Sequence, residues 1–270
     1  MKEEFVKATT LITNVMILLT AIVGCSKDEA TGPQQGTTGT LKVLMVDAPA
    51  AYDAVNIVID SVEAHVTQSD TIKGWTTLNR TSKTYDLLKL ANGASAVIGS
   101  AVLPAGKYSQ IRLFIGSGSN VVVSGITNAL TVPSGAQSGL KLNINADIQA
   151  DMTYELVLDF DANKSIEANN NKYNLKPTIR TVAIATTGII SGTISPAVAH
   201  PTIWAIAALD SFSTVADTAG IFKLAYLDPG TYSVRILPKD QTAYRDTLLT
   251  GKVVTAGATL SLETIILTNK

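Results

Sequence analysis

Asp159, Asp161 and Asn163 alternate along the chain in the pattern D-x-D-x-N. Oxygen-bearing side chains with this spacing open a calcium-binding loop, because alternate residues can turn toward one ion. The later positions fit less well, since Lys164 stands where such a loop needs glycine and Asn170 where it needs a bidentate glutamate. Two interpretations stay open: a calcium site, or outward-facing polar side chains at the end of a strand.

A second possible chemistry uses paired carboxylates. Asp47, with Asp159 or Asp161, could supply the acid and base of a hydrolase, either metal-dependent or of the glycosidase type. This requires that the fold brings these residues into one cleft, which the sequence alone does not show. Asp47 also precedes Ala48-Pro49, so its side chain could instead cap a turn.

Other catalytic groups lack the partners that they need. The two histidines, His65 and His200, have no second metal ligand at helical or hairpin spacing. No serine stands in a G-x-S-x-G elbow. The glycine- and serine-rich residues 116–119 are not followed by the lysine and helix of a phosphate-binding loop. We therefore expect no catalytic activity and no cofactor, apart from the calcium alternative.

The two tryptophans favour different roles. Glycan-binding surfaces expose flat aromatic rings that stack on sugars, and aromatic residues make up only 6% of this chain. Trp75 follows Lys73-Gly74 at the start of an expected strand, so it is the candidate for glycan binding, with packing against the sheet as the alternative. Trp204 stands within an apolar run, which predicts a core position.

The single cysteine, Cys25, ends a mostly apolar stretch that follows Lys2 and Lys7. The run Ile22-Val23-Gly24-Cys25 resembles the lipobox of bacterial lipoprotein signal peptides. That resemblance implies cleavage before Cys25 and attachment of acyl chains such as palmitate, which together hold a protein stably at a membrane. The apolar stretch is short for a permanent span. A signal anchor or an ordinary signal peptide is the alternative.

The residues after the cysteine predict a cellular location. Ser26, Lys27, Asp28 and Glu29 resemble the export tag that sends some lipoproteins to the outer face of the outer membrane, although an ordinary solvated linker has a similar composition. Polar residues, glycine and proline then continue to Gly39 without any apolar side chain to bury. We therefore assign residues 1–24 to the signal peptide and 25–39 to a lipidated, flexible tether.

Composition points to a β protein. Hydrophobic residues make up 46% of the chain and charged residues 16%, with a net charge of −1. No basic stripe with interleaved aromatic residues is present, so we expect no nucleic-acid partner. Valine, isoleucine and threonine, which favour strands, are abundant.

The pattern along the chain predicts two domains. Apolar runs of strand length alternate with turn-forming clusters from Gly39 onward, and only residues 87–101 could be helical or irregular. A hinge is expected at residues 186–188. The fold class is therefore all-β, with two tandem antiparallel β-sandwiches of immunoglobulin or transthyretin type over residues 40–187 and 188–270.

The two predicted domains share one phrase. Leu103-Pro104-Ala105-Gly106-Lys107-Tyr108 parallels Leu227-Asp228-Pro229-Gly230-Thr231-Tyr232. Proline presets φ, glycine allows positive φ, and the tyrosine ring can dock where the next strand begins. The phrase predicts a structural corner in each sandwich, with positive φ at both glycines.

Ordered segments of the first block carry a family resemblance. TGTLKVLMVDAPAAYDAVNIVIDSVEAH, KTYDLLKLANG, LPAGKYSQIRLFIG, SGLKL, YELVLDFDANKSI and YNLKPTIRTV resemble the bacterial lipoprotein family called domain of unknown function 4382, over about residues 39–185. The resemblance implies a secreted or lipidated β-sandwich and no particular reaction.

The second block resembles carboxypeptidase regulatory-like domains, which have a transthyretin-like sandwich. The similar residues follow the pattern G-x-F-x-L…L-x-P-G-x-Y, in Gly220–Leu224 and Leu227–Tyr232. Such domains are usually non-catalytic, and related sandwiches often bind carbohydrate. We therefore expect a lipid-anchored outer-membrane protein, facing the cell exterior, that binds a glycan or an envelope protein. A structural or assembly role with a protein partner is the main alternative.

Overall fold

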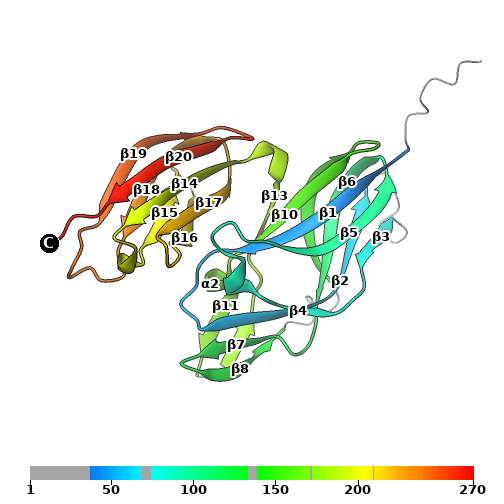
Figure 1. Ribbon diagram of the computed structural model, residues 1–270. Coiled ribbons are helices and arrows are strands. Elements are labelled where there is room, and N and C mark those ends of the chain that lie inside the picture. Colours follow the sequence, from blue (N-terminus) through cyan, green and yellow to red (C-terminus); the bar gives the residue numbers. More distant parts are fainter. Residues whose placement is uncertain (1–36, 68–73, 133–138, 171, 209) are drawn as a thin grey trace, which may run out of the picture. The chain divides into compact units, whose positions relative to one another are not determined.

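The computed structural model describes residues 37–67, 74–132, 139–170, 172–208 and 210–270 (Figure 1). Cys25 and the residues Ser26, Lys27, Asp28 and Glu29 lie outside this described part, so the predictions of lipidation and export stand as predictions. Among the described residues, no helix has the length and apolar composition to cross a bilayer. Strands dominate, which confirms the all-β class.

Two sheets form the first sandwich, over residues 38–183. The four-stranded sheet has the order β13-β10-β1-β5, and the nine-stranded sheet follows the path β11-β12-β8-β7-β2-β6-β9, with β3 and β4 paired to β2 (Figure 1). The bounds are β1 Thr38–Asp47, β2 Ala54–Val66, β3 Trp75–Asn79, β4 Lys83–Asp86, β5 Ala96–Pro104, β6 Gly106–Ile115, β7 Asn120–Val123, β8 Ile126–Thr131, β9 Leu140–Ile148, β10 Thr153–Phe160, β11 Ile166–Asn169, β12 Lys172–Leu175 and β13 Ile179–Ala183.

Strand β1 is apolar on both faces. Leu41, Val43 and Met45 point into the core between the two sheets, whereas Leu44 and Val46 belong to a separate apolar cluster on the outer face. A strand between two neighbours that reads as a continuous apolar run is typical of a position covered on both sides. Something must therefore cover the outer face of the four-stranded sheet.

The second sandwich pairs a three-stranded sheet, order β17-β14-β20, with a four-stranded sheet, order β16-β15-β18-β19. It has its own apolar core, which includes Ile190, Phe222 and Val234. The bounds are β14 Gly188–Ser195, β15 Thr202–Ile206, β16 Ser211–Val215, β17 Ile221–Leu227, β18 Gly230–Leu237, β19 Thr247–Val254 and β20 Thr259–Ile266.

Three strand pairings are parallel, which the sequence reading did not anticipate. They join β1 with β10, β8 with β12, and β14 with β20, and the other pairings between described strands are antiparallel. Long connections separate the strands of each parallel pair, so no hairpin imposes opposite directions on them. The sheets are therefore mixed, within the predicted sandwich architecture.

The few helical turns are short. They are η1 Leu87–Leu90, α2 Ala162–Ser165, η2 Ile184–Thr186 and η3 Ala197–Ala199. The patch at residues 87–101 is thus one 3-10 turn followed by the start of β5.

The repeated phrase forms the predicted corner in both sandwiches. Tyr108 and Tyr232 are buried, and each hydroxyl donates a hydrogen bond to the carbonyl four residues earlier, at 3.2 Å to Pro104 and 2.8 Å to Asp228. The glycines differ, because Gly106 has a φ of +144° whereas Gly230 is not in the positive-φ region. The prediction of positive φ is therefore right for the first corner and wrong for the second.

The link between the sandwiches is a hydrogen-bonded turn. The Thr186 and Thr187 hydroxyls donate to the carbonyls of Ala183 and Ile184, at 2.9 and 3.0 Å. A Cβ at Gly188 would collide with the Thr255 carbonyl, so this position lies tightly against the turn after β19. The segment predicted as a hinge is thus packed, and the described residues belong to one compact unit.

Candidate functional site: a cleft between the sandwiches

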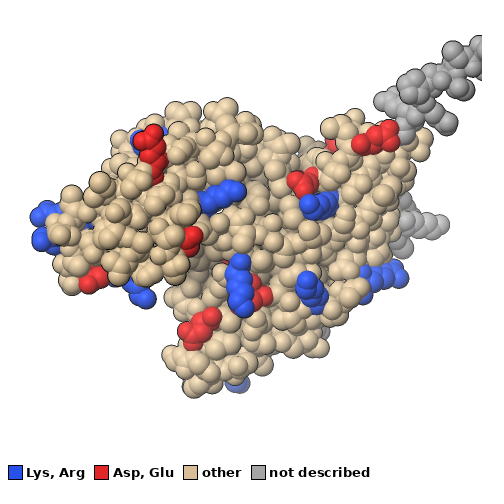
Figure 2. All heavy atoms as spheres, viewed as in Figure 1, with Lys and Arg blue, Asp and Glu red and all other residues tan. Residues whose placement is uncertain are grey.

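Residues of both sandwiches line a cleft of about 450 Å³. The first sandwich contributes five of the seven charged side chains, and the second contributes the three aromatic ones. The charged lining residues are Asp47, Asp159, Asp161, Lys164, Arg180, Asp210 and Lys223, and the aromatic ones are Trp204, Phe212 and Tyr226. On the face shown in Figure 2, lysine and arginine lie interspersed with aspartate and glutamate among mostly uncharged atoms.

The parallel pairing of β1 and β10 brings the acids together. Its register places Val46 opposite Asp159 and Asp47 opposite Phe160. Because both strands run in the same direction, their carboxyl ends reach the same edge of the sheet. Asp47, Asp159 and Asp161 therefore converge on one cleft, as the hydrolase hypothesis requires.

Asp47 is buried at the end of β1, with only 7% of its surface exposed. Its Oδ1 accepts a hydrogen bond of 2.9 Å from the Ala162 backbone N–H, and its Oδ2 has no partner among the described residues. Burial raises the pKa of Asp47 to about 8, and the charges of Asp159 and Asp161 add to the rise. Asp47 is thus mostly protonated at neutral pH. Its hydrogen bond with Ala162 joins residues that are 115 positions apart in the sequence.

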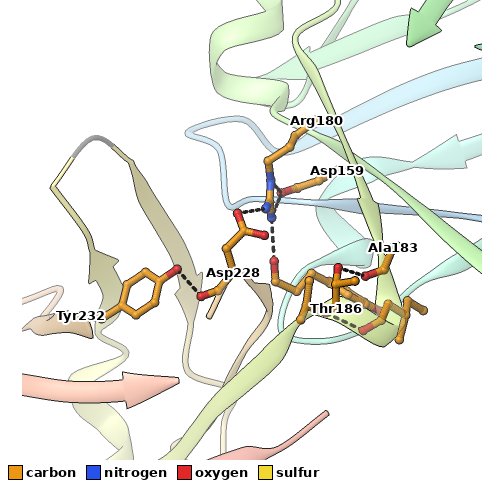
Figure 3. A network of polar contacts seen from close by, with 9 residues as sticks. Asp159, Arg180, Ala183, Thr186, Asp228 and Tyr232 are labelled. Atoms are coloured by element: carbon orange, nitrogen blue, oxygen red, sulfur yellow. Dashed lines mark hydrogen bonds and ion pairs between the residues drawn. The ribbon is translucent and has the colours of Figure 1, made fainter. Parts of the chain in front are cut away.

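Arg180 is the hub of the cleft (Figure 3). It faces Asp159 directly across the β10–β13 pair, and its Nη2 lies 3.0 Å from Asp159 Oδ2. The same Nη2 donates to the Tyr226 carbonyl at 2.8 Å, and Nη1 lies 3.4 Å from Asp228 Oδ2. The guanidinium also stacks on the Phe212 ring, 4.5 Å from its centroid. Burial raises the pKa of Asp159, and the Arg180 charge opposes that rise.

The contacts of Asp161 favour the interpretation of Asp161 and Asn163 as polar side chains at a strand end, and the calcium site stays a prediction. The Asp161 carboxylate caps the short helix α2 by accepting from the Lys164 backbone N–H at 2.9 Å, and the Lys164 ammonium lies 2.8 Å from its other oxygen. A lysine ammonium therefore occupies the position where a cation would bind. The chain then enters α2 and β11 instead of curling around an ion. Within the described ranges, no group of three or more His, Cys, Asp or Glu side chains could hold a metal.

Tyr226 joins the two sandwiches through a bulge. On β17, Leu224 and Leu227 are three positions apart, whereas their partners on β14, Ile190 and Gly188, are two positions apart. The extra residue, together with a φ of +60° at Tyr226, turns this side chain away from the second core. It packs instead on the outer apolar cluster of the first sandwich, formed by Leu44, Val46, Val157 and Val182. Tyr226 therefore covers the outer face that β1 leaves apolar.

Asn92 makes a second connection between the sandwiches. Its side-chain oxygen accepts from the Lys223 backbone N–H at 2.6 Å, and its side-chain nitrogen donates to the Ile221 carbonyl at 3.3 Å. The Asn92 side-chain amide thus bonds to backbone groups of the edge strand β17, as a neighbouring strand would. Together with Arg180 and Tyr226, this contact fixes the two walls of the cleft.

Trp204 lines the cleft, and the prediction of a core position is wrong. Its neighbours on β15, Ile203 and Ala205, point into the core, so the alternation of the strand places Trp204 on the opposite face. Among the described residues, no ring or cation stacks on Trp204, and no acceptor takes its indole N–H. Ser213 pairs with Trp204 and shares its face, whereas Thr214 pairs with core-facing Ile203, and its buried Oγ1 has no partner within the described part of the chain.

Trp75 lies away from the cleft. The Arg112 guanidinium stacks on its ring, 3.8 Å from the centroid, and the His65 ring lies 4.9 Å from it. The face that a sugar would need is therefore occupied by a cation. The packing alternative describes Trp75 better than the glycan-binding role does.

Sequence reasoning missed Arg180, Tyr226 and Trp204 as cleft residues. A usable signal existed for the first, because Arg180 is the one charged residue in the strand Ile179–Ala183. For Tyr226, the apolar run at residues 43–46 is a signal that the outer face of β1 is covered, although it does not indicate which residue covers it. No local signal marks the bulge at Tyr226, since its strand otherwise alternates normally.

Comparisons with known proteins give one family. The family profile described as domain of unknown function (DUF4382) matches residues 38–177. No curated protein sequence matches the chain.

Several solved structures are distantly similar. A chain of a type II cohesin–X-dockerin complex from Acetivibrio cellulolyticus is 20% identical, with 30% of this chain and 56% of that chain covered and a TM-score of 0.23. The Bacillus anthracis TIE protein is 11% identical over 86% of this chain and 34% of that one, with a TM-score of 0.24. The minor pilin GBS52 of Streptococcus agalactiae is 11% identical over 85% and 96%, also with a TM-score of 0.24. Neither function nor partner follows from similarities at this level.

Proposed function

This chain belongs to the DUF4382 family, and we propose that it is a non-catalytic, lipid-anchored protein of the bacterial outer membrane that binds its ligand in the cleft between the sandwiches. The observation that carries the binding function is the cleft itself. Its two walls come from different sandwiches and are held together by Arg180, Tyr226 and Asn92. A pre-organised concave site between two packed parts of a protein is typical of ligand binding.

The acids have structural duties that favour binding over catalysis. Asp161 caps α2 and pairs with Lys164, while Asp159 pairs with Arg180. A catalytic base must be free to accept a proton from substrate or water, and these two carboxylates are already engaged by cations. The cleft therefore suits recognition through hydrogen bonds and ring stacking.

The binding function is tested by a matched pair of tryptophan variants. Trp204→Ala removes a ring that lines the cleft, and Trp75→Ala removes one that lies outside it under Arg112. We expect a ligand or partner recovered with the wild-type protein to be lost with Trp204→Ala and kept with Trp75→Ala. Equal loss in both variants, or in neither, would contradict binding in the cleft.

The membrane location rests on Cys25 and the four residues after it. We expect Cys25→Ala to move the protein from the membrane fraction to the soluble fraction, since the acyl chains supply the anchor. Changing Lys27, Asp28 and Glu29 to alanine should protect the protein from protease added to intact cells, with Cys25 unchanged as the control. Unaltered membrane association of Cys25→Ala would contradict the lipid anchor. Unaltered protease cleavage of the variant with Lys27, Asp28 and Glu29 changed to alanine would contradict surface display.

Hydrolysis is a second candidate, favoured by the convergence of Asp47, Asp159 and Asp161. Asp47 carries a proton at neutral pH and Asp159 faces Arg180, so the pair could divide the roles of acid and base. Release of reducing sugar from glycans by the wild-type protein, abolished in Asp47→Asn, would establish this function. Binding without turnover would exclude it.

A further inference from the structure

We infer that the ligand of the cleft is a neutral sugar of one or two rings, stacked on Trp204 and hydrogen-bonded to polar groups of both walls. This inference rests on the proposed binding function and adds the chemical class of the ligand. Charge, unpaired polar atoms, the exposed ring and the size of the cleft support it independently.

The charges of the cleft are largely paired with one another. Lys164 lies 2.8 Å from Asp161, and Arg180 lies 3.0 Å from Asp159 and 3.4 Å from Asp228. An anionic ligand would have to compete with these carboxylates for the two cations, and a cationic ligand would have to compete with the cations. Of the remaining titratable lining groups, Asp210 and Lys223 have opposite signs, and burial raises the pKa of Asp47 to about 8, so its carboxyl is mostly neutral at pH 7. The site therefore offers no surplus charge and fits a neutral ligand.

Polar side chains without a protein partner line both walls. Asn163 belongs to the first sandwich and Ser213 to the second, and neither side chain has a hydrogen bond within the described residues. A sugar hydroxyl both donates and accepts, so it can bind either group directly or through one water molecule.

Trp204 supplies the surface for stacking. Its ring is partly exposed in the cleft, and no cation or ring among the described residues covers it. The C–H faces of a pyranose are apolar and flat, and they match an indole face, while the indole N–H can donate to a hydroxyl. Trp75, by contrast, is already stacked under Arg112.

The size of the cleft limits the ligand. Its volume of about 450 Å³ lies in the lower part of the range of small-molecule sites, ~300–1,000 Å³. One or two sugar rings fit such a space, whereas a longer glycan would have to extend out of it.

The inference is tested by titrating the purified full-length protein in detergent with single sugars. The neutral probes are glucose, galactose, mannose, N-acetylglucosamine and their disaccharides, and the charged probes are glucuronic acid and glucosamine. Binding is measured by calorimetry and by saturation-transfer NMR. We expect at least one neutral probe to bind, and its charged counterpart to bind about tenfold more weakly or not at all, because it must disrupt an ion pair.

Variants locate the bound sugar. Trp204→Ala should weaken binding about tenfold and Trp204→Phe less, because a smaller ring still stacks. Ser213→Ala removes the hydroxyl that lies opposite Trp204 on the same face and should weaken binding without lowering the melting temperature, because that hydroxyl has no partner among the described residues. Trp75→Ala is the control and should leave binding unchanged.

Three results would overturn the inference: no neutral probe binds, a charged probe binds as tightly as its neutral counterpart, or Trp204→Ala binds as the wild type does. If a protein or an ionic ligand is captured instead and is lost with Trp204→Ala, the sugar is excluded while binding in the cleft stands. If no ligand is found whose binding depends on the Trp204 side chain, the proposed function itself is contradicted.

Discussion

The two sandwiches are built alike and contribute differently to the cleft. Each has its own apolar core and its own tyrosine corner, with Tyr108 in the first and Tyr232 in the second. The first sandwich supplies Asp47, Asp159, Asp161 and Arg180, whereas the second supplies Trp204, Phe212 and Ser213. Shared corners stabilise each sandwich, and the differences lie at the surfaces that meet. Similar local sequence thus predicts shared stability and says little about the site.

Removing the second sandwich is the largest test of this comparison. A chain ending at Thr187 should still unfold cooperatively, because the first sandwich has its own core. It should lose all ligand binding, because the wall that carries Trp204 and Ser213 is absent. Its melting temperature should fall, since Tyr226 no longer covers Leu44 and Val46. Thermal melts followed by circular dichroism measure the cooperativity of unfolding and the melting temperature. Molten behaviour of the shortened chain would show that the sandwiches are one folding unit.

Truncating the corner tyrosines tests whether the corners are equivalent. Tyr108→Ala and Tyr232→Ala should each lower the free energy of unfolding by about 3–5 kcal/mol, since both remove a large buried ring. The Phe variants keep the ring and lose only the hydroxyl bond, which is worth about 1 kcal/mol. Urea denaturation gives these values. A binding defect in a variant that melts normally would mean that a corner recognises ligand.

Asp47→Asn tests the buried carboxyl at the edge of the first sandwich. The folded pKa of about 8 exceeds the ordinary value of 3.8, so between these limits the folded state holds a proton that the unfolded state releases. Stability conferred by the neutral carboxyl is therefore complete below about pH 4 and is lost as the pH rises to about 8.

The amide cannot ionise, so Asp47→Asn should be more stable than the wild type by roughly 2–5 kcal/mol at pH 8 and about equal to it at pH 4. The neighbouring charges of Asp159, Asp161, Arg180 and Lys164 remain in both proteins. Urea melts across this pH range make the comparison. A stability difference that does not change with pH would show that Asp47 is ionised in the folded protein.

The glycines of the two corners should give the smallest effect and the finest distinction. Gly106→Ala places a β-carbon at a φ of +144° and should cost about 1 kcal/mol through backbone strain alone, since no atom lies within 4 Å of the new group. Gly230→Ala should cost less than about 0.5 kcal/mol, because its φ is not positive. Equal losses in the two variants would show that the corners have the same backbone conformation.

The sequence determined the parts of the fold that depend on local pattern. Alternating apolar residues predicted strands, and the phrase ending in tyrosine predicted both corners. The phrase did not determine the backbone at Gly230, because the tyrosine bond forms at either glycine conformation. The three acids were also recognised as a set, although their separation of more than one hundred residues left their meeting open.

The tertiary structure decided the site. Only the parallel pairing of β1 with β10 brings Asp47 to the same sheet edge as Asp159 and Asp161. Only the bulge at Tyr226 and the face of β15 decide that Tyr226 and Trp204 leave the second core. The physical reason is that strand direction, register and the side of a sheet that meets a neighbour depend on contacts between distant segments. The alternation of residues along one strand fixes two faces, and the rest of the fold decides which face is covered.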